Sequence, residues 1–150
     1  MGLRVSELVK LQVSDVDLTE RVVIVRDGKG GKDRAIPLEK RSCTALKTYL
    51  SLRGDTSCPA LFLSYQGQGL SDRSVKKLVE KYRKKAGIEK KISCHSLRHS
   101  FGVYKAEQGV SPWQLQQWFG HSNLQTTQIY THVGSRQNGR KVMEQTSLPT

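Results

Sequence analysis

The chain has 150 residues, of which 36% are hydrophobic, a length and composition that suit one globular domain. Its 25 lysines and arginines outnumber its 13 aspartates and glutamates, and the formal net charge of +12 favours a polyanionic partner over a merely basic, soluble surface. No apolar run approaches the ~20 residues that span a membrane, and the first residues lack the apolar core of a signal peptide, so a membrane-spanning or secreted protein is not expected.

The first part of the chain predicts a helix followed by a β-hairpin. Apolar residues at helical spacing predict a short helix over 6–11. The β-branched run 21–26 and the segment 34–38 predict the two strands of the hairpin, joined by the glycine-rich turn 27–33. Pro37 has no backbone N–H to donate, so we expect the second strand to lie at a sheet edge or to end there.

The rest of the chain predicts mostly helix. A helix over 41–53 precedes the short apolar segment 60–63, which we expect to add a third strand. Ser71 can cap a helix over 72–86. The remaining expected helices cover residues 95–108, 112–119 and 122–130. The predicted fold class is therefore α+β, mainly α-helical with a small antiparallel sheet of about three strands, in one domain over residues 1–150.

The expected helix over 72–86 separates an apolar stripe from a basic face. Val75, Leu78, Val79 and Tyr82 form the stripe, which we expect to pack on the core so that the lysines face away from it. The residues expected to contact a phosphate backbone are Lys76, Lys77, Arg83 and Lys84, with Lys32 of the glycine-rich turn. A solvated helix face with no binding role is the alternative.

The three cysteines, Cys43, Cys58 and Cys94, are odd in number and show no CxxC spacing. This pattern argues against a disulfide scaffold or a zinc site and favours a reducing compartment, the cytoplasm. Cys94 precedes His95, but adjacent residues on a helix do not face each other, so a nucleophilic thiol is not expected.

A separate set of side chains could act on a phosphodiester. Such cleavage needs a nucleophile, positive charge around the pentavalent state and a proton for the leaving oxygen. Arg4 and Arg98 can each pair two phosphate oxygens and stay ionised, and His95 and His121 can exchange a proton near neutral pH. Tyr130 is a phenol, a group that ionises near pH ~10 in water, so it needs the positive field of the arginines or a base to act as the nucleophile.

Each of these residues also has an ordinary structural explanation. His95 and Arg98 share one helix face at i,i+3, but a capping histidine and a surface arginine would show the same spacing. Tyr130 alone could be half-buried packing for its helix. His121 directly follows a glycine, so it could lie at a plain helix end.

Two further charged residues are candidates for the same site. Lys29 lies at the tip of the expected hairpin, where a flexible ammonium can reach into a groove, although a turn lysine is usually only solvated. Glu7 lies three residues after Arg4 and can hold that arginine through an i,i+3 contact. The alternative for Glu7 is a surface ion pair that contributes little.

Together, the order and spacing of these residues resemble the catalytic domain of the tyrosine recombinase (phage integrase) family, close to its Xer-type members. The family's first box resembles residues 2–8, GLRVSEL, and its second box resembles residues 95–101, HSLRHSF. The final box resembles residues 115–133, which contain GHS and TTQIYTHV. The hairpin lysine of the family matches Lys29 rather than Lys32. The resemblance covers nearly the whole chain.

The resemblance implies six catalytic residues, which are Arg4, Lys29, His95, Arg98, His121 and Tyr130, with Glu7 in support. It implies that Tyr130 attacks the scissile phosphate and forms a 3′-phosphotyrosyl link, while Lys29 gives a proton to the departing 5′-hydroxyl. The two arginines would clamp the non-bridging oxygens. The two histidines would hydrogen-bond the phosphate, and His95 would accept the tyrosine proton. The ester keeps the bond energy, so neither a metal nor a nucleotide cofactor is expected.

The resemblance also predicts an incomplete assembly. The family has more protein before the first box, namely further helices of the catalytic domain and a core-binding domain that completes a clamp around DNA. We therefore expect Leu3, Val5 and Leu8 to lack packing partners, and exposed apolar surface of this kind favours association or low stability. A trimmed piece, a truncated gene and a short working protein are the alternative explanations.

Two functional hypotheses follow, an enzyme that cuts and rejoins DNA at specific sites, in integration or recombination, and a non-catalytic DNA-binding remnant or regulator of a full-length recombinase. A type IB topoisomerase uses related chemistry, but the spelling of the boxes resembles recombinases. The expected partner is double-stranded DNA, with self-association as a tetramer on DNA if the protein is complete. The expected location is the cytoplasm, at the nucleoid, without a membrane or small-molecule substrate.

Overall fold

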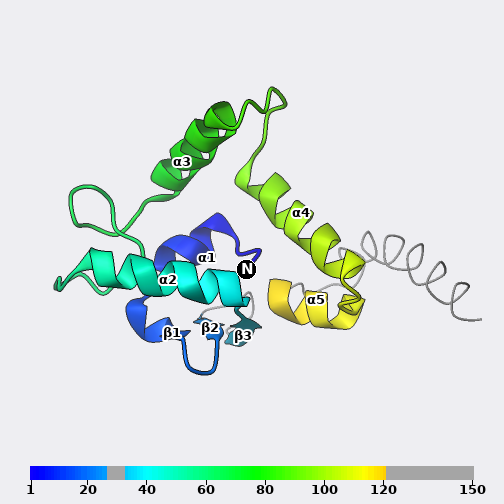
Figure 1. The fold of residues 1–150 in the computed structure, drawn as a ribbon, viewed down its shortest axis with the longest axis horizontal. Helices are drawn as coiled ribbons and strands as arrows, with labels where there is room; N and C mark the ends of the chain where they lie inside the picture. Colours follow the sequence, from blue (N-terminus) through cyan, green and yellow to red (C-terminus); the bar gives the residue numbers. More distant parts are fainter. Residues whose placement is uncertain (27–32, 121–150) are drawn as a thin grey trace, which may run out of the picture.

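A computed structural model describes residues 1–26 and 33–120 of the chain. Its elements are α1 (Val5–Lys10), the 3-10 turn η1 (Val13–Asp15), β1 (Val16–Asp17), β2 (Val22–Val25), β3 (Arg34–Pro37), α2 (Lys40–Arg53), α3 (Asp72–Lys85), α4 (Cys94–Glu107) and α5 (Pro112–Phe119). The α+β class, mainly helical with a three-stranded antiparallel sheet, is confirmed (Figure 1). Among these helices, none is long and apolar enough to cross a membrane.

The sheet has the order β1-β2-β3, and both pairings are antiparallel. The predicted hairpin is confirmed, because β2 and β3 pair with Val23 opposite Ile36, and both side chains are fully buried. Alternate residues of a strand face one side, which explains why this pair enters the core while Pro37, on the edge strand, stays exposed.

The prediction that residues 60–63 supply the third strand is wrong. That strand is β1, and Ala60 forms only an isolated bridge with Gln12. The η1 turn begins directly after Gln12 and directs the chain away, so the pairing stops after one bridge. The segment still reaches the core, since the Leu61 side chain is fully buried and its N–H donates to the Leu11 carbonyl at 2.7 Å.

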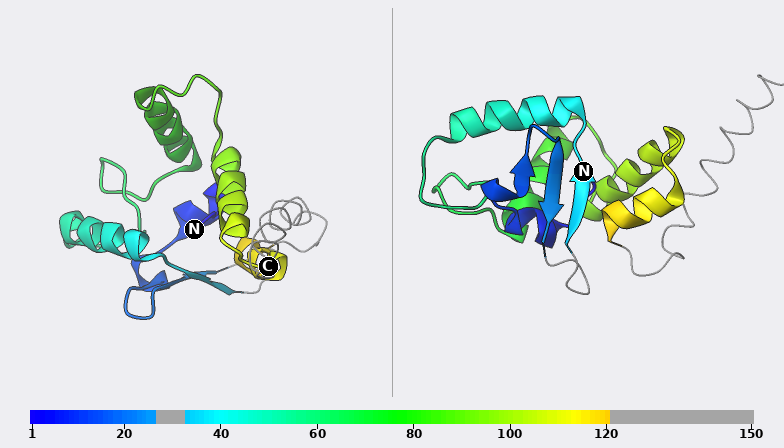
Figure 2. Two further views of the ribbon diagram at one scale, coloured as in Figure 1. Left: turned by 45° about the vertical axis from the view of Figure 1, so that its right-hand side comes forward. Right: turned by 90° about the horizontal axis from the view of Figure 1, so that it is seen from below.

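Two apolar clusters hold these elements together. The first lies between the sheet and α2 and is formed by Leu11, Val23, Leu38, Cys43, Leu46 and Leu61. The second lies between α4 and α5 and is built from Ala106, Leu115 and Phe119. Figure 2 shows α2 running over the sheet, with α4 and α5 beside β3. The last turn of α5 is therefore brought to the edge of the sheet.

The helix ends follow the sequence closely. Ser71 caps α3, since its hydroxyl accepts the Ser74 N–H at 3.2 Å, as predicted. Ser111 caps α5 in the same way, and Pro112 takes the first helical position. Gly120 ends α5 in the left-handed conformation, with φ 57° and ψ 47°, which glycine adopts without steric cost.

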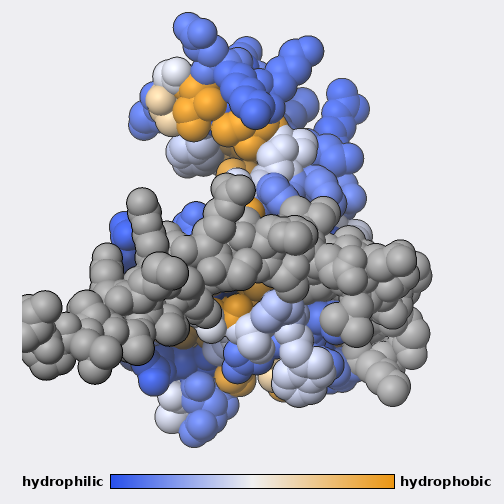
Figure 3. Space-filling view, turned by 90° about the vertical axis from the view of Figure 1, so that its right-hand side faces the viewer, coloured by the Kyte–Doolittle hydropathy of each residue, from blue (hydrophilic) through white to orange (hydrophobic). Residues whose placement is uncertain are grey.

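The apolar stripe of α3 is only partly covered, contrary to the prediction. None of its residues is buried, and Leu78 and Tyr82 are 38% and 60% exposed. In Figure 1, α3 stands apart from the sheet, and Figure 3 shows apolar atoms on the upper part of the surface. Amphipathic spacing marks which face of a helix is apolar, but a neighbouring element has to cover that face. In the described part of the chain, α3 packs mainly on the short helix α1.

Candidate active site

Glu7 is the centre of a charged cluster next to the sheet. Arg4 is the residue before α1, and its backbone N–H and its Nη1 donate to the two oxygens of the Glu7 carboxylate, each at 2.8 Å. The predicted i,i+3 contact between Arg4 and Glu7 is therefore present. The Glu7 side chain is only 10% exposed, so this is not the surface ion pair considered as the alternative.

Two more guanidinium groups face the same carboxylate. Arg34 donates from Nη2 to Glu7 Oε2 at 2.8 Å, and Nη1 of Arg98 lies 3.6 Å from that oxygen. Burial raises the pKa of Glu7, but hydrogen bonds from the Arg4 backbone and from the Arg34 and Arg4 side chains outweigh it and hold that pKa below its usual value. Glu7 is therefore a carboxylate that orients arginines, not a proton donor at neutral pH.

The carboxyl end of α5 receives the same three guanidinium groups. Arg4 Nη1 and Arg98 Nη2 both donate to the Phe119 carbonyl, at 3.2 and 2.7 Å, and Arg34 Nε donates to the Trp118 carbonyl at 2.8 Å. The last carbonyls of a helix have no partner within it and carry partial negative charge. The cluster thus satisfies this helix end and fixes it against α1 and β3.

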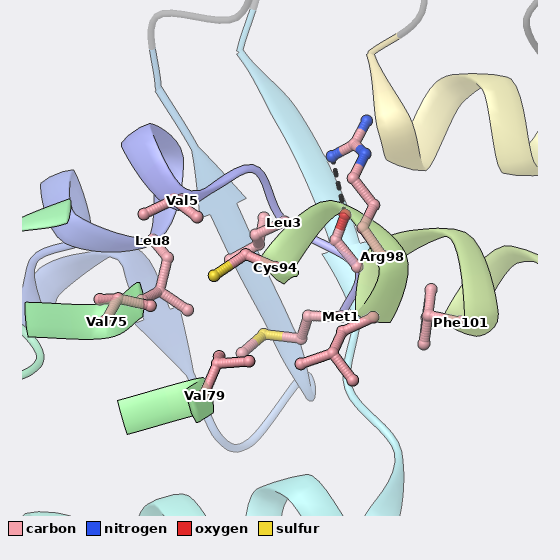
Figure 4. Close-up of a pocket in the computed structure, with 11 residues that line it drawn as sticks. Met1, Leu3, Val5, Leu8, Val75, Val79, Cys94, Arg98 and Phe101 are labelled. Carbon is pink, nitrogen blue, oxygen red and sulfur yellow. Dashed lines mark hydrogen bonds between the residues drawn. The ribbon is translucent and has the colours of Figure 1, made fainter. Parts of the chain in front are cut away.

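Arg98 enters the cluster from α4 and is buried. Its side chain is 5% exposed, and its Nη1 donates to the Gly2 carbonyl at 2.7 Å (Figure 4). Its guanidinium lies 4.5 Å from the centre of the Phe119 ring. Gly2 has a φ of 64°, and a Cβ at that position would come within 2.6 Å of Phe101 and Phe119. This arrangement excludes a surface arginine as the explanation of Arg98.

His95 lies one helical turn before Arg98 but on the exposed side of α4. It borders an open hollow of about 380 Å³ that is also lined by Val5 of α1 and by Lys76 and Glu80 of α3. The structure therefore brings Arg4, Glu7 and Arg98 together. It places His95 at the border of the hollow beside α3.

The other predicted site residues, Lys29, Lys32, His121 and Tyr130, lie outside the described residues. Two of them, His121 and Lys32, are nevertheless close in sequence to residues of the cluster. Gly120, whose carbonyl lies 3.4 Å from Arg4 Nη2, directly precedes His121. Arg34 follows Lys32 after one residue.

Sequence reasoning missed Arg34, although a signal for it was present. Arg34 and Ile36 occupy alternate positions of one strand, so they share the face that enters the core. A charged side chain on such a face needs a partner of opposite charge or a set of acceptors. The strand pattern could therefore have marked Arg34 as part of a buried polar cluster.

The basic residues of α3 differ in their surroundings. Lys76, Lys77 and Lys84 are exposed. Arg83 is 13% exposed and is engaged by Glu80 through two hydrogen bonds of 2.7 and 2.9 Å and by the carbonyls of Ile88 and Glu89. The guanidinium of Arg83 thus closes the loop after α3.

A hollow of about 370 Å³ opens between the N-terminal segment, α3 and α4 (Figure 4). Leu3, Val5 and Leu8 line it and are half-buried, and Leu3 also packs against the first apolar cluster. Within the described ranges, no group of three or more His, Cys, Asp or Glu side chains is placed to share a metal ion.

Glu7→Gln should lower the free energy of unfolding by about 2 kcal/mol at pH 7, because the three guanidinium groups lose a charged acceptor. The pKa of Glu7 is lowered in the folded state, so its stabilisation is present above the unfolded value near 4.5 and is lost as pH falls through the folded value. Urea unfolding at several pH values should therefore show the gap between variant and parent shrinking on acidification. Glu80→Gln, which removes an exposed i,i+3 partner of Arg83, should have a smaller effect. A gap that does not depend on pH would contradict the assignment.

The chain was compared with family models, curated proteins and solved structures. The phage integrase family model matches residues 1–136. Tyrosine recombinase XerA of Pyrococcus horikoshii is 43% identical over 150 residues, a match that covers 98% of this chain and 51% of that protein. The crystal structure of XerA recombinase has a TM-score of 0.82 and 38% identity, covering 99% of this chain and 54% of the other.

A solved complex gives a further match. The XerH site-specific recombinase bound to its difH substrate, before cleavage, has a TM-score of 0.74 and 31% identity, covering 87% of this chain and 39% of that chain. The chain spans about half the length of the curated relatives it matches.

Proposed function

Because the chain belongs to the phage integrase family, we propose that it is the catalytic domain of a site-specific DNA recombinase, which cuts and rejoins strands through a 3′-phosphotyrosine intermediate. The observation that carries the proposal is the convergence of Arg4 and Arg98 on Glu7 and on the end of α5, directly before His121. A binding module needs positive charge on its surface. It does not need two arginines ordered around one buried carboxylate.

The reaction exchanges one phosphate ester for another. The Tyr130 oxygen forms a bond to the phosphorus, the bond to the 5′-oxygen breaks, and Lys29 supplies the proton that makes the leaving group a hydroxyl. His95 and His121 hydrogen-bond the phosphate, and His95 accepts the tyrosine proton. Attack by a free 5′-hydroxyl of another strand reverses the step. No metal or nucleotide cofactor enters this scheme.

The two arginines have different parts in this scheme. Arg4 is 37% exposed and meets the phosphate oxygens directly. Arg98 is only 5% exposed, so in place of the direct clamp expected of both arginines it supplies positive charge from within the protein. Preorganised donors of this kind stabilise charge that develops in the transition state without a cost of reorganisation.

Double-stranded DNA is the proposed substrate, and the complex of the related XerH site-specific recombinase with its difH substrate supports this. Lys76 is the best placed lysine of α3, because it borders the same hollow as His95. Lys32, Lys77 and Lys84 are the other proposed contacts with the DNA phosphate backbone. Arg83, which was predicted to make such a contact, instead holds the loop after α3.

Lys76→Ala should weaken DNA binding equally for all sequences and reduce the slope of log K against log salt by about 1. Fluorescence anisotropy with a labelled duplex at several salt concentrations measures both. Lys47→Ala, which removes an exposed lysine on α2, is the matched control and should leave the slope unchanged. An unchanged slope for Lys76→Ala would remove this residue from the DNA interface.

The relatives are about twice as long, so we assign residues 1–150 to the catalytic half of a larger DNA-bound unit. The remaining half would close around the DNA as a core-binding domain, and the active form would be a tetramer on DNA in the cytoplasm, at the nucleoid. The open apolar hollow beside Leu3, Val5 and Leu8 supports a further packing partner for this half.

Covalent trapping tests the proposed function. The chain is incubated with duplexes that carry a nick next to the scissile phosphate, so that the released fragment diffuses away and the protein–DNA ester accumulates. A denaturing gel should then show a protein band whose mobility is shifted by the attached strand. Binding without any linked species would overturn the enzymatic proposal and leave the non-catalytic DNA-binding function.

A further inference from the structure

We propose that Arg34 is a positioning residue of the site, which ties the Glu7 carboxylate to the carboxyl end of α5 and so sets where Arg4 and Arg98 lie. Its Nη2 donates to Glu7 Oε2 and its Nε donates to the Trp118 carbonyl, each at 2.8 Å. Its side chain is 9% exposed. Arg34 therefore acts through its protein partners, and the inference rests on the proposed function for its catalytic consequence.

The position of Arg34 along the chain lets its side chain connect three separate segments. Arg34 is the first residue of β3, and its backbone is paired with Val25 of β2. The glycine-rich segment with Lys29 leads directly into it. One side chain thus joins the strand that follows Lys29, the carboxylate that orients Arg4 and the helix that precedes His121.

The contact with α5 is close as well as polar. A Cβ at position 120 would lie 3.1 Å from Arg34 Nη1, so the guanidinium packs against the backbone of Gly120. Nη1 is buried and has no hydrogen-bond partner among the residues that the structure describes. The Arg34 side chain is therefore held by two directed bonds and by the turn that ends α5.

Lysine cannot replace this arrangement. Guanidinium presents Nε and Nη2 in one rigid plane, so it can serve two acceptors on different elements at the same time. An ammonium is a single point on a flexible stem, and either the Glu7 bond or the Trp118 bond would be lost. Arg34→Lys therefore keeps the charge and removes the bridge.

Arg26→Lys is a matched control on the same hairpin. Arg26 follows β2, at the other side of the glycine-rich segment, and its Nε pairs with Asp15 Oδ1 at 2.6 Å. The two variants make the same chemical change to an ion-paired arginine, one inside the cluster and one outside it.

The first measurement does not need DNA. The Glu7 carboxyl carbon is followed by NMR as pH is lowered, together with the backbone amides of Phe119 and Gly120. In Arg34→Lys, Glu7 should titrate at higher pH than in the parent where the Glu7 bond is the one lost, and the two amide signals should move where the Trp118 bond is the one lost. Arg26→Lys should match the parent. Unchanged Glu7 titration and unchanged amides in Arg34→Lys would overturn the proposal.

The second measurement asks whether the bridge matters for chemistry. At saturating nicked duplex, Arg34→Lys should form the covalent species roughly 10- to 100-fold more slowly, with DNA affinity within about threefold of the parent. Glu7→Gln and the double variant should show nearly the same loss, since both residues act through one contact. Additive losses, or a weaker affinity with a normal rate, would count against positioning through Glu7.

These two measurements separate the two proposals. If the parent chain forms no covalent species, the proposed function fails, and the NMR titration alone decides the role of Arg34. If the parent forms the ester and Arg34→Lys forms it equally fast, the catalytic consequence of the bridge fails while the function stands.

Discussion

Tyr130→Phe should abolish the covalent protein–DNA species while leaving DNA affinity within about twofold of the parent. The change removes one oxygen and keeps the ring, so only the attacking atom is lost, and a loss of at least about 10³-fold in ester formation is expected. Denaturing gels with a nicked duplex measure the ester, and anisotropy with an intact duplex measures the affinity.

Tyr104→Phe is the control for this experiment. Tyr104 lies on α4 and is 50% exposed, so its hydroxyl is open to solvent and its removal should leave ester formation unchanged. If Tyr130→Phe still became linked to DNA, another residue would be the nucleophile. Protease digestion of the linked species followed by mass spectrometry would then identify the peptide that carries the nucleotide.

Arg98→Met should lose both stability and cleavage. Methionine fills part of the volume, but the Gly2 carbonyl loses its Arg98 donor, the Phe119 carbonyl keeps only its longer bond from Arg4, and Glu7 loses one of its three cations. Breaking a buried charged contact in this way costs about 3 kcal/mol of unfolding free energy. Single-turnover ester formation should fall by about 10³-fold at a temperature where the variant is folded, because positive charge under the phosphate is removed.

Arg53→Met separates the two effects. Arg53 of α2 also donates to two backbone carbonyls, those of Cys58 and Ala60, but it lies outside the Glu7 cluster. Its replacement should lower the unfolding free energy measured in urea and leave the rate of ester formation unchanged. Equal cleavage rates in the Arg98 and Arg53 variants would reduce Arg98 to a structural role.

Sequence periodicity predicted the elements that depend on local rules. Helices α3 and α5 begin after serine caps and end near glycines, and β2 and β3 follow from a β-branched run and the glycine-rich sequence after it. Such features need only the chemistry of neighbouring residues. The contact between Arg4 and Glu7 was predictable for the same reason, since i,i+3 side chains on a helix meet.

The features that the sequence did not predict depend on distant contacts. β1 has only two residues, too few to show a period, and it forms because Val16 pairs with Val23. The role of Arg34 depends on Trp118, which is 84 residues away. The incomplete cover of the α3 stripe has the same origin, because spacing along one helix carries no information about its neighbours.

The cluster around Glu7 has a consequence for the resting protein. One carboxylate faces three guanidinium groups. The other acceptors of these groups are helix carbonyls, which carry only partial negative charge, so the positive charge of the cluster is not fully balanced. A phosphodiester carries the full negative charge that this cluster lacks. The substrate would therefore complete an electrostatic balance that the folded protein alone leaves open, and cutting and resealing a strand would each begin from a site already poised for an anion.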